Sequence, residues 1–224
     1  MAINGAGHDT PYNLLVDIGN TFLKWGRYRL APTGHAADNF LDGGHALLAE
    51  APALASLYAQ YRAPRAIIIS NVAGTRLRAM MLRAFEVWIE PPQPRWLIAQ
   101  PRQCGMTNGY RNPAQLGVDR WAAMIGARAL VPRGPLLVVN CGTATTIDFI
   151  SARSEFTGGV ILPGLGLMMR SLHRGTAGLP DAEGDYTDHP RQTVDAMVSG
   201  CQHAQAGAIE RLFTNEQRVM PDVA

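Results

Sequence analysis

Long hydrophobic runs and a strong net charge are both missing from this chain of 224 residues. A membrane helix needs about 18 or more consecutive apolar residues, and no such run occurs, so the sequence predicts no membrane span. The formal net charge is only +2, and the basic residues are scattered along the chain. A nucleic-acid surface requires a concentrated basic patch, so we do not expect nucleic acid as a partner.

Cysteine is also scarce in this sequence. The three cysteines, Cys104, Cys141 and Cys201, are far apart and odd in number. Such a set argues against a disulfide framework and favours reduced thiols, so we expect a cytoplasmic protein. The six histidines show no metal-ligand spacing. Residues 1–10 lack the apolar core of a signal peptide and are interpreted as a loose leader.

The sequence does contain a regular alternation of strand and helix patterns. Hydrophobic residues make up 47% and charged residues 17%, which is typical of a soluble globular protein of one or two domains. Strands are expected at residues 14–18, from 22 onward, and at 39–41, 65–70, 96–98, 136–140 and 147–150; helices are expected at 45–61, 75–85, 119–130, 167–172 and 193–213. The glycines within residues 156–166 are interpreted either as turn residues or as places where the backbone approaches a ligand. Pro52 predicts a break or late start in the first helix, and Thr75 is the expected N-cap of the second. In the last helix, Ala196, Met197, Ala204, Ala208 and Leu212 are the expected buried positions. The order of these elements predicts an α/β protein.

Residues 14–18 form a short apolar run that carries one carboxylate, Asp17, and ends at Gly19 and Asn20. The run is typical of a buried strand, and the two turn residues tolerate positive φ, so a tight hairpin is expected. Exposed N–H groups in such a turn bind phosphate oxygens, and the carboxylate is suited to a hydrated magnesium ion. Taken alone, the motif is explained equally well as an ordinary hairpin turn.

The same pattern recurs in the second half of the chain. Residues 138–146 again place an apolar strand before a glycine and small hydroxyl residues, with Asn140 at the position of Asp17. At these two places the chain resembles the actin-like fold of heat-shock ATPases, sugar kinases and acetate kinases. The resemblance implies two similar actin-like (ribonuclease H-like) domains, each a mixed sheet with helices. It also implies an active site in the cleft between them. Cys141, beside the second hairpin, is interpreted as a small buried hydrophobic residue.

A polar loop at residues 109–118 leads into the helix that starts near Asp119. An acid in the first turn complements the helix dipole, which explains Asp119 without any function. On that explanation Arg120 is a surface charge. Judged from these residues alone, the structural explanation is favoured over a functional one.

Four segments together resemble one family, the type III pantothenate kinases. They are Asp-Ile-Gly-Asn-Thr at 17–21, Gly-Val-Asp-Arg at 117–120, Gly-Thr-Ala-Thr-Thr at 142–146, and Gly-Gly-Val-Ile-Leu-Pro-Gly at 158–164. Residues 176–180 and 192–200 also look similar, so the resemblance runs from about residue 14 to residue 212. The shared order of these motifs is far more specific than any one of them.

The resemblance implies a transferase that uses ATP and Mg²⁺ to phosphorylate pantothenate, the first step of coenzyme A biosynthesis. It also implies a homodimer with the substrate pocket near the dimer interface. Asp17 would orient magnesium through water, Lys24 would offset phosphate charge, and Thr143 would contact ATP from the second domain. The hairpin residues assigned to ATP are Asp17, Ile18, Gly19, Asn20, Thr21, Phe22, Leu23 and Lys24.

On the acceptor side, the resemblance makes Asp119 the candidate general base for the hydroxyl of pantothenate. A neighbouring arginine, Arg120, would bind the carboxylate of the substrate. The family also contacts substrate from the positions of Tyr110 and Thr193. The expected substrate-binding set is therefore Tyr110, Gly117, Val118, Asp119, Arg120 and Thr193.

Two departures from the family pattern affect these expectations. The family usually has an aspartate at Asn140, which helps to bind an activating monovalent cation, K⁺ or NH₄⁺. A neutral amide is a weaker cation ligand, so dependence on such a cation is left open.

The second departure concerns the C-terminal part of the chain. We expect an N-terminal domain at residues 11–130 and a C-terminal domain at 131–224. The second domain is expected to lack the strand and helix with which the family continues, including a turn near the adenine. That would weaken ATP binding and stability.

Two other functions are compatible with the sequence. A kinase-derived regulator without catalysis is favoured by Asn140 and the short C-terminal part, but retention of Asp17 and Asp119 argues against it. An actin-like kinase for another small hydroxy acid would use the same pair of residues, Asp119 and Arg120, on an alcohol and a carboxylate.

Overall fold

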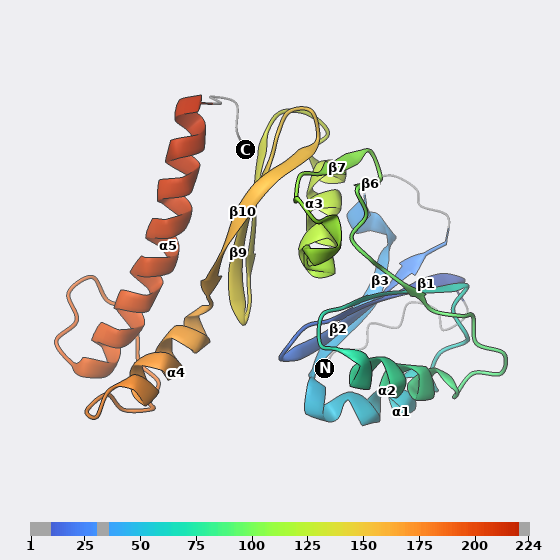
Figure 1. The fold of residues 1–224 in the computed structure, drawn as a ribbon. Helices are drawn as coiled ribbons and strands as arrows, with labels where there is room; N and C mark the ends of the chain where they lie inside the picture. The colour runs from blue at the N-terminus through green and yellow to red at the C-terminus, as the bar shows by residue number, and fades with distance from the viewer. Residues whose placement is uncertain (1–9, 31–35, 220–224) are drawn as a thin grey trace. The chain divides into compact units, whose positions relative to one another are not determined.

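The computed structural model describes residues 10–30 and 36–219 (Figure 1). Most of the predicted leader, at residues 1–10, therefore lies outside the described residues. The protein is α/β, as predicted, with two five-stranded mixed sheets. The chain groups into two compact units. Unit 1 comprises Met1–Ala99 and Leu116–Ala122, and unit 2 comprises Gln100–Gln115 and Ala123–Ala224. None of the described helices is long and apolar enough to cross a membrane.

The sheet of unit 1 has the strand order β3-β2-β1-β4-β5. Its strands are β1 (Tyr12–Ile18), β2 (Phe22–Arg29), β3 (Phe40–Leu47), β4 (Ala66–Asn71) and β5 (Arg95–Trp96). β1, β2 and β3 form an antiparallel meander, whereas β4 is parallel to β1 and β5 is parallel to β4. The first hairpin and the strand predicted at 65–70 are confirmed. The parallel pair places the carboxyl ends of β1 and β4 at the same edge of the sheet.

One face of this sheet carries the core of unit 1. Alternate residues of β1 are buried, and they form one cluster with side chains from α1 (Leu54–Tyr58) and α2 (Thr75–Phe85). The buried residues of β1 are Tyr12, Leu14, Val16 and Ile18. Because successive side chains in a strand point to opposite faces, Asp17 lies on the face away from this cluster.

Two expectations for unit 1 are wrong at their boundaries. The helix expected at 45–61 is reduced to α1. Residues up to Leu47 belong to β3 and pair with β2. The next six residues form a 3₁₀ helix, η2 (Leu48–Ala53), which contains Pro52. Gly74, not Thr75, is the N-cap of α2, and its φ of 88° lies in the region that favours glycine. A further 3₁₀ helix, η1 (Ala36–Asn39), precedes β3.

The sheet of unit 2 has the strand order β6-β7-β10-β9-β8. Its strands are β6 (Arg102–Gln103), β7 (Met106–Asn108), β8 (Leu136–Cys141), β9 (Ala144–Ile150) and β10 (Glu155–Pro163). β8, β9 and β10 form an antiparallel meander in the same relative order as β1, β2 and β3, so the predicted similarity of the two hairpins extends to three strands. β6 and β7 were not predicted, because two or three residues carry too little pattern.

Helices α4 (Leu165–Gly175) and α5 (Thr193–Val219) pack beside each other in unit 2 (Figure 1). The long helix expected at 193–213 is confirmed and extends further, but Ala196 and Ala204 are exposed rather than buried, whereas Met197 is buried. A short 3₁₀ helix, η3 (Pro113–Gln115), precedes α3 (Val118–Leu130), which is the helix predicted at 119–130.

Candidate functional site

A row of polar residues crosses the sheet of unit 1 on the face opposite the core. The strand register pairs Asp17 with Lys24 on β2 and with Ser70 on β4. Lys24 is paired in turn with His45 on β3. Residues directly opposite each other in neighbouring strands project from the same face, so these four side chains lie in one line. The register thus brings the predicted pair, Asp17 and Lys24, together.

The carboxylate of Asp17 is poorly satisfied by the protein itself. Its Oδ1 atom is shielded from solvent and has no hydrogen-bond partner, and the same is true of Ser70 Oγ. An unpaired buried carboxylate oxygen costs free energy, so this site favours a ligand that brings a donor or a cation. Sequence reasoning missed Ser70, although its place at the carboxyl end of a strand parallel to β1 was a usable signal.

The carboxylate of Asp17 suits a magnesium ion, which needs few protein ligands, better than it suits a metal that is held by protein side chains alone. Among the described residues there is no group of three or more histidine, cysteine, aspartate or glutamate side chains arranged to hold a metal. Magnesium commonly uses one or two carboxylates, several waters and substrate phosphates. The single unsatisfied carboxylate of Asp17 matches that mode of binding.

The turn after β1 is tight, as predicted, although neither Gly19 nor Asn20 uses the positive φ that these residues tolerate. The N–H of Gly19 donates a hydrogen bond to the carbonyl of Phe22 at 3.0 Å, and the N–H of Leu48 donates to the carbonyl of Thr21 at 3.1 Å. A Cβ on residue 19 would lie 3.2 Å from the Phe22 carbonyl oxygen, so glycine suits this position. Asn20, Thr21 and Lys24 are exposed around the turn.

Asp119 is held by the first turn of α3. Its Oδ1 atom accepts a hydrogen bond of 2.8 Å from the N–H of Arg120, and the N–H of Trp121 donates to the carbonyl of Gly117 at 3.0 Å. A Cβ on residue 117 would lie 2.7 Å from Asp119 Oδ1, so the carboxylate needs the glycine before it. The interpretation of Arg120 as a surface charge is wrong, because its side chain is only 6% exposed. A buried guanidinium points to a role inside the fold or in a binding site.

Tyr110 lies in a loop of unit 2 that is fixed by a buried asparagine. Asn108 accepts a hydrogen bond of 3.1 Å from the N–H of Tyr110 and donates one of 3.3 Å to the carbonyl of Pro113. The ring centroid of Tyr110 lies 5.1 Å from that of Phe156 on β10. Thr193 is exposed at the first residue of α5.

The second hairpin, between β8 and β9, packs against the start of α4. The N–H of Gly164 donates a hydrogen bond of 3.0 Å to the carbonyl of Thr143, and a Cβ on residue 164 would lie 2.0 Å from the carbonyl oxygen of Gly142. Asn140 pairs with Thr146 and is exposed. Cys141 is exposed as well, so its interpretation as a buried hydrophobic residue is wrong.

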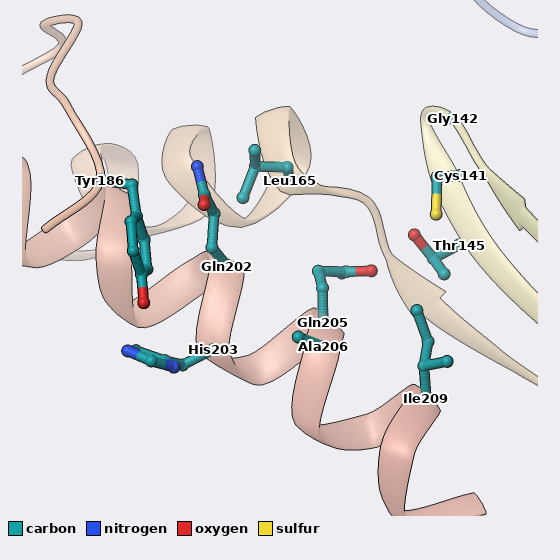
Figure 2. A pocket seen from close by; sticks show the side chains of 10 residues that line it. All are labelled: Cys141, Gly142, Thr145, Leu165, Tyr186, Gln202, His203, Gln205, Ala206 and Ile209. Atoms are coloured by element: carbon teal, nitrogen blue, oxygen red, sulfur yellow. The ribbon is translucent and has the colours of Figure 1, made fainter. Parts of the chain in front are cut away.

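A pocket of about 610 Å³ opens beside this hairpin (Figure 2). Its lining residues are Cys141, Gly142, Thr145, Leu165, Tyr186, Gln202, His203, Gln205, Ala206 and Ile209. They come from four separated parts of unit 2, and no motif in the sequence marked them as neighbours.

Comparison with known proteins relates these motifs to one family. The family model described as Type III pantothenate kinase matches residues 13–215. The chain belongs to the type III pantothenate kinase family. A curated protein of that name from Aromatoleum aromaticum is 48% identical over 200 residues, which cover 89% of this chain and 78% of the relative. Another from Dechloromonas aromatica is 45% identical over 199 residues, with coverage of 89% and 79%. A third, from Azoarcus sp., is 47% identical over 203 residues, with coverage of 89% and 73%.

Membership of this family confirms the resemblance found in the sequence. The predicted site residues fall in both units. Asp17 to Lys24 and Gly117 to Arg120 lie in unit 1, where the strand register and the α3 turn group them locally. Tyr110, Asn140, Thr143 and Thr193 lie in unit 2. The role of each individual residue stays a prediction.

Proposed function

We propose that this chain transfers the γ-phosphoryl group of ATP to the hydroxyl group of pantothenate and forms 4′-phosphopantothenate and ADP. This reaction is the first step of coenzyme A biosynthesis. The observation that carries the proposal is the family match over residues 13–215, which includes the Asp17 hairpin, the Asp119 turn and the Thr143 hairpin. Phosphoryl transfer depends on positioning and charge neutralisation more than on covalent chemistry, and the residues of these three segments are suited to both.

In this proposal the first hairpin holds the phosphates of ATP. Its backbone N–H groups and the exposed Lys24 would attract phosphate oxygens, and Asp17 would hold a magnesium ion through water. Magnesium, when bound, supplies neutralisation of the charge on the transferring group. The unsatisfied Asp17 oxygen supports this role. Thr143 is the proposed nucleotide contact of unit 2.

The acceptor alcohol is activated by Asp119, whose carboxylate takes the hydroxyl proton as the bond to phosphorus forms. The 2.8 Å hydrogen bond from the N–H of Arg120 fixes the orientation of that carboxylate. Arg120 binds the carboxylate of pantothenate, for which the planar guanidinium is well suited. Tyr110, Gly117, Val118 and Thr193 complete the proposed substrate contacts.

Several coarser features belong to the same proposal. The protein acts as a homodimer in the cytoplasm. Its proposed N-terminal domain is 11–130 and its proposed C-terminal domain is 131–224, whereas residues 100–115 and 123–130 group with unit 2 in the structure. A monovalent cation, K⁺ or NH₄⁺, would have only the neutral amide of Asn140 where the family usually has an aspartate, so its binding would depend on carbonyl oxygens nearby. Pantothenate is the small-molecule partner, and no nucleic acid is involved.

The purified protein, given ATP, Mg²⁺ and millimolar pantothenate, is expected to produce ADP and 4′-phosphopantothenate in equal amounts. The assay is run with K⁺ or NH₄⁺ present, and mass spectrometry identifies the product. Replacement of Asp17 by asparagine serves as the matched negative control, because it removes the charge but retains the shape. Formation of ADP without phosphopantothenate contradicts the assignment of pantothenate as the substrate. A higher rate with another hydroxy acid as the acceptor contradicts it as well.

Replacement of Arg120 by lysine is expected to raise KM for pantothenate about tenfold or more and to leave KM for ATP unchanged. Lysine keeps the charge but loses the planar pair of donors that fits a carboxylate. Arg76→Lys, an exposed position in α2, is the matched control. Steady-state kinetics with each substrate varied in turn separates the two constants, and an unchanged KM for pantothenate removes Arg120 from this role.

A further inference from the structure

Ser70, near the end of β4, is a buried polar residue whose hydroxyl group is left without a partner. The residue is only 5% exposed, and its Oγ atom is shielded from solvent and makes no hydrogen bond within the described part of the chain. An unpaired buried hydroxyl costs free energy that an alanine at the same position would not cost. The serine therefore indicates a partner that comes from outside the protein chain.

The parallel pairing of β1 with β4 places Asp17 beside this hydroxyl. Asp17 is opposite Ser70 in the register, one strand spacing of about 4.8 Å away. The preceding residues in the two strands, Val16 and Ile69, belong to the core, so Asp17 and Ser70 project together from the other face. Asp17 Oδ1 is also shielded and unpaired among the described residues. A hydrogen bond from Ser70 to Asp17 would satisfy both atoms, but the structure does not form it.

Two unpaired oxygen atoms on one face of the sheet are suited to a small group that donates two hydrogen bonds. A water molecule has two such protons and commonly satisfies buried polar atoms of this kind. A hydrated magnesium ion presents several waters, and protein groups that accept from these waters help to hold the ion. The carboxylate of Asp17 and the hydroxyl of Ser70 form such a pair of acceptors. Lys24, opposite Asp17 on the other neighbouring strand, is not an alternative, because an ammonium group accepts no hydrogen bond.

We propose that Ser70 is a positioning residue for magnesium, and that its hydroxyl accepts a hydrogen bond from a water of the hydrated ion beside Asp17. The inference rests on the proposed function, which assigns the hydrated ion to Asp17. Ser70 touches neither the phosphates nor the acceptor alcohol, and it acts only through the water shell of the ion. Groups that hold the ligands of a metal in this indirect way commonly contribute about 10–100-fold to its affinity.

Replacement of Ser70 by alanine is the first test. Calorimetry measures the binding of AMP-PNP, an ATP analogue that is not hydrolysed, with Mg²⁺ present and again with EDTA. Ser70→Ala is expected to raise the Kd about tenfold or more with Mg²⁺ and less than about twofold with EDTA. Ser56→Ala, at an exposed position in α1, is the matched control and keeps both wild-type constants. A wild-type Kd for Ser70→Ala with Mg²⁺, or an equal loss under both conditions, overturns the proposal.

Thermal melting and a conservative variant separate this role from a structural one. Ser70→Ala removes an unpaired buried hydroxyl, so the ligand-free variant is expected to melt at the wild-type temperature or above it. A clearly lower melting temperature means that the hydroxyl supports the fold, and it overturns the proposal. Ser70→Thr keeps the hydroxyl and is expected to bind AMP-PNP with Mg²⁺ within about threefold of the wild type. A folded Ser70→Thr variant that binds as weakly as Ser70→Ala contradicts a role for the hydroxyl.

A double variant tests whether Ser70 acts through the ion that Asp17 holds. In an Asp17→Asn background, Ser70→Ala is expected to change the Kd for AMP-PNP with Mg²⁺ by less than about twofold, because the carboxylate that holds the ion is gone. An equal loss in the presence and absence of the Asp17 carboxylate means that the two residues act independently, which overturns the proposal.

Analysis of the reaction product separates this inference from the proposed function. If AMP-PNP binding with Mg²⁺ depends on Ser70 but no phosphopantothenate forms, the role of Ser70 stands and the proposed reaction fails. If phosphopantothenate forms and Ser70→Ala keeps the wild-type Kd with Mg²⁺, the reaction stands and the role of Ser70 is overturned.

Discussion

Replacement of Asp119 by asparagine is expected to lower kcat for pantothenate phosphorylation by about 10²–10⁴-fold. Asparagine retains an oxygen that can accept the 2.8 Å hydrogen bond from the N–H of Arg120, so the first turn of α3 is preserved. The amide cannot take up a proton, and therefore the substrate hydroxyl is no longer activated. Because Asp119 is assigned to the acceptor and not to the nucleotide, KM for ATP is expected to change by less than about threefold.

The measurement is steady-state kinetics with both substrates, supported by direct titration of ATP binding. Glu86→Gln, the same carboxylate-to-amide change at an exposed position after α2, serves as the control and retains wild-type kcat. If Asp119→Asn keeps kcat within about threefold of the wild type, the carboxylate is not the general base. The favoured explanation is then the simpler one, an acid that complements the helix dipole.

Replacement of Asp42 by alanine is expected to destabilise unit 1 by about 3 kcal/mol, because it breaks a buried ion pair with Arg27. This value is at the low end of the range for such a loss, since the Asp42 side chain is 17% exposed. Arg27, on β2, is only 2% exposed and donates to both carboxylate oxygens of Asp42 on β3, with its Nε atom 2.6 Å from Oδ1. Its guanidinium lies 4.0 Å from the ring centroid of Tyr61 and 5.0 Å from that of Tyr12. The hydrogen bonds to Asp42 hold the pKa of Arg27 above its ordinary value. Removal of Asp42 therefore leaves a buried cation without its partner.

Urea unfolding followed by tryptophan fluorescence isolates this effect. All four tryptophans, at positions 25, 88, 96 and 121, belong to unit 1, so the signal reports on that unit. The double variant Arg27→Met/Asp42→Leu is expected to recover most of the lost stability, since it removes both charges and leaves apolar side chains of similar volume. A midpoint for Asp42→Ala equal to that of the wild type would mean that the pair adds no net stability.

Local patterns in the sequence were sufficient for the parts of the fold that depend on neighbouring residues. The alternation in β1 and the turn chemistry of Gly19 and Asn20 predicted the first hairpin, and the same pattern predicted the second. Each of these features is decided within about ten residues. The order of four motifs was enough to predict the family, which the comparisons confirm.

Features that depend on distant parts of the chain were not predictable in this way. Residues 45–47 have the alanine and leucine content of a helix, yet pairing with β2 makes them a strand. Arg120 looked like a surface charge until the packing of α3 showed it to be buried. Gln205, in the pocket beside the second hairpin, carried no signal at all, because its side-chain amide donates to a carbonyl 42 residues away and its oxygen is left unpaired.

The sequence by itself therefore determined the family, the two hairpins and the start of α3, since short-range turn and strand preferences specify them. Only the tertiary structure decided which polar atoms are buried without a partner. The free energy of such an atom depends on every group around it, and those groups come from parts of the chain that no local pattern connects. Asp17 and Ser70 illustrate this, because the parallel pairing of β1 and β4 sets them side by side.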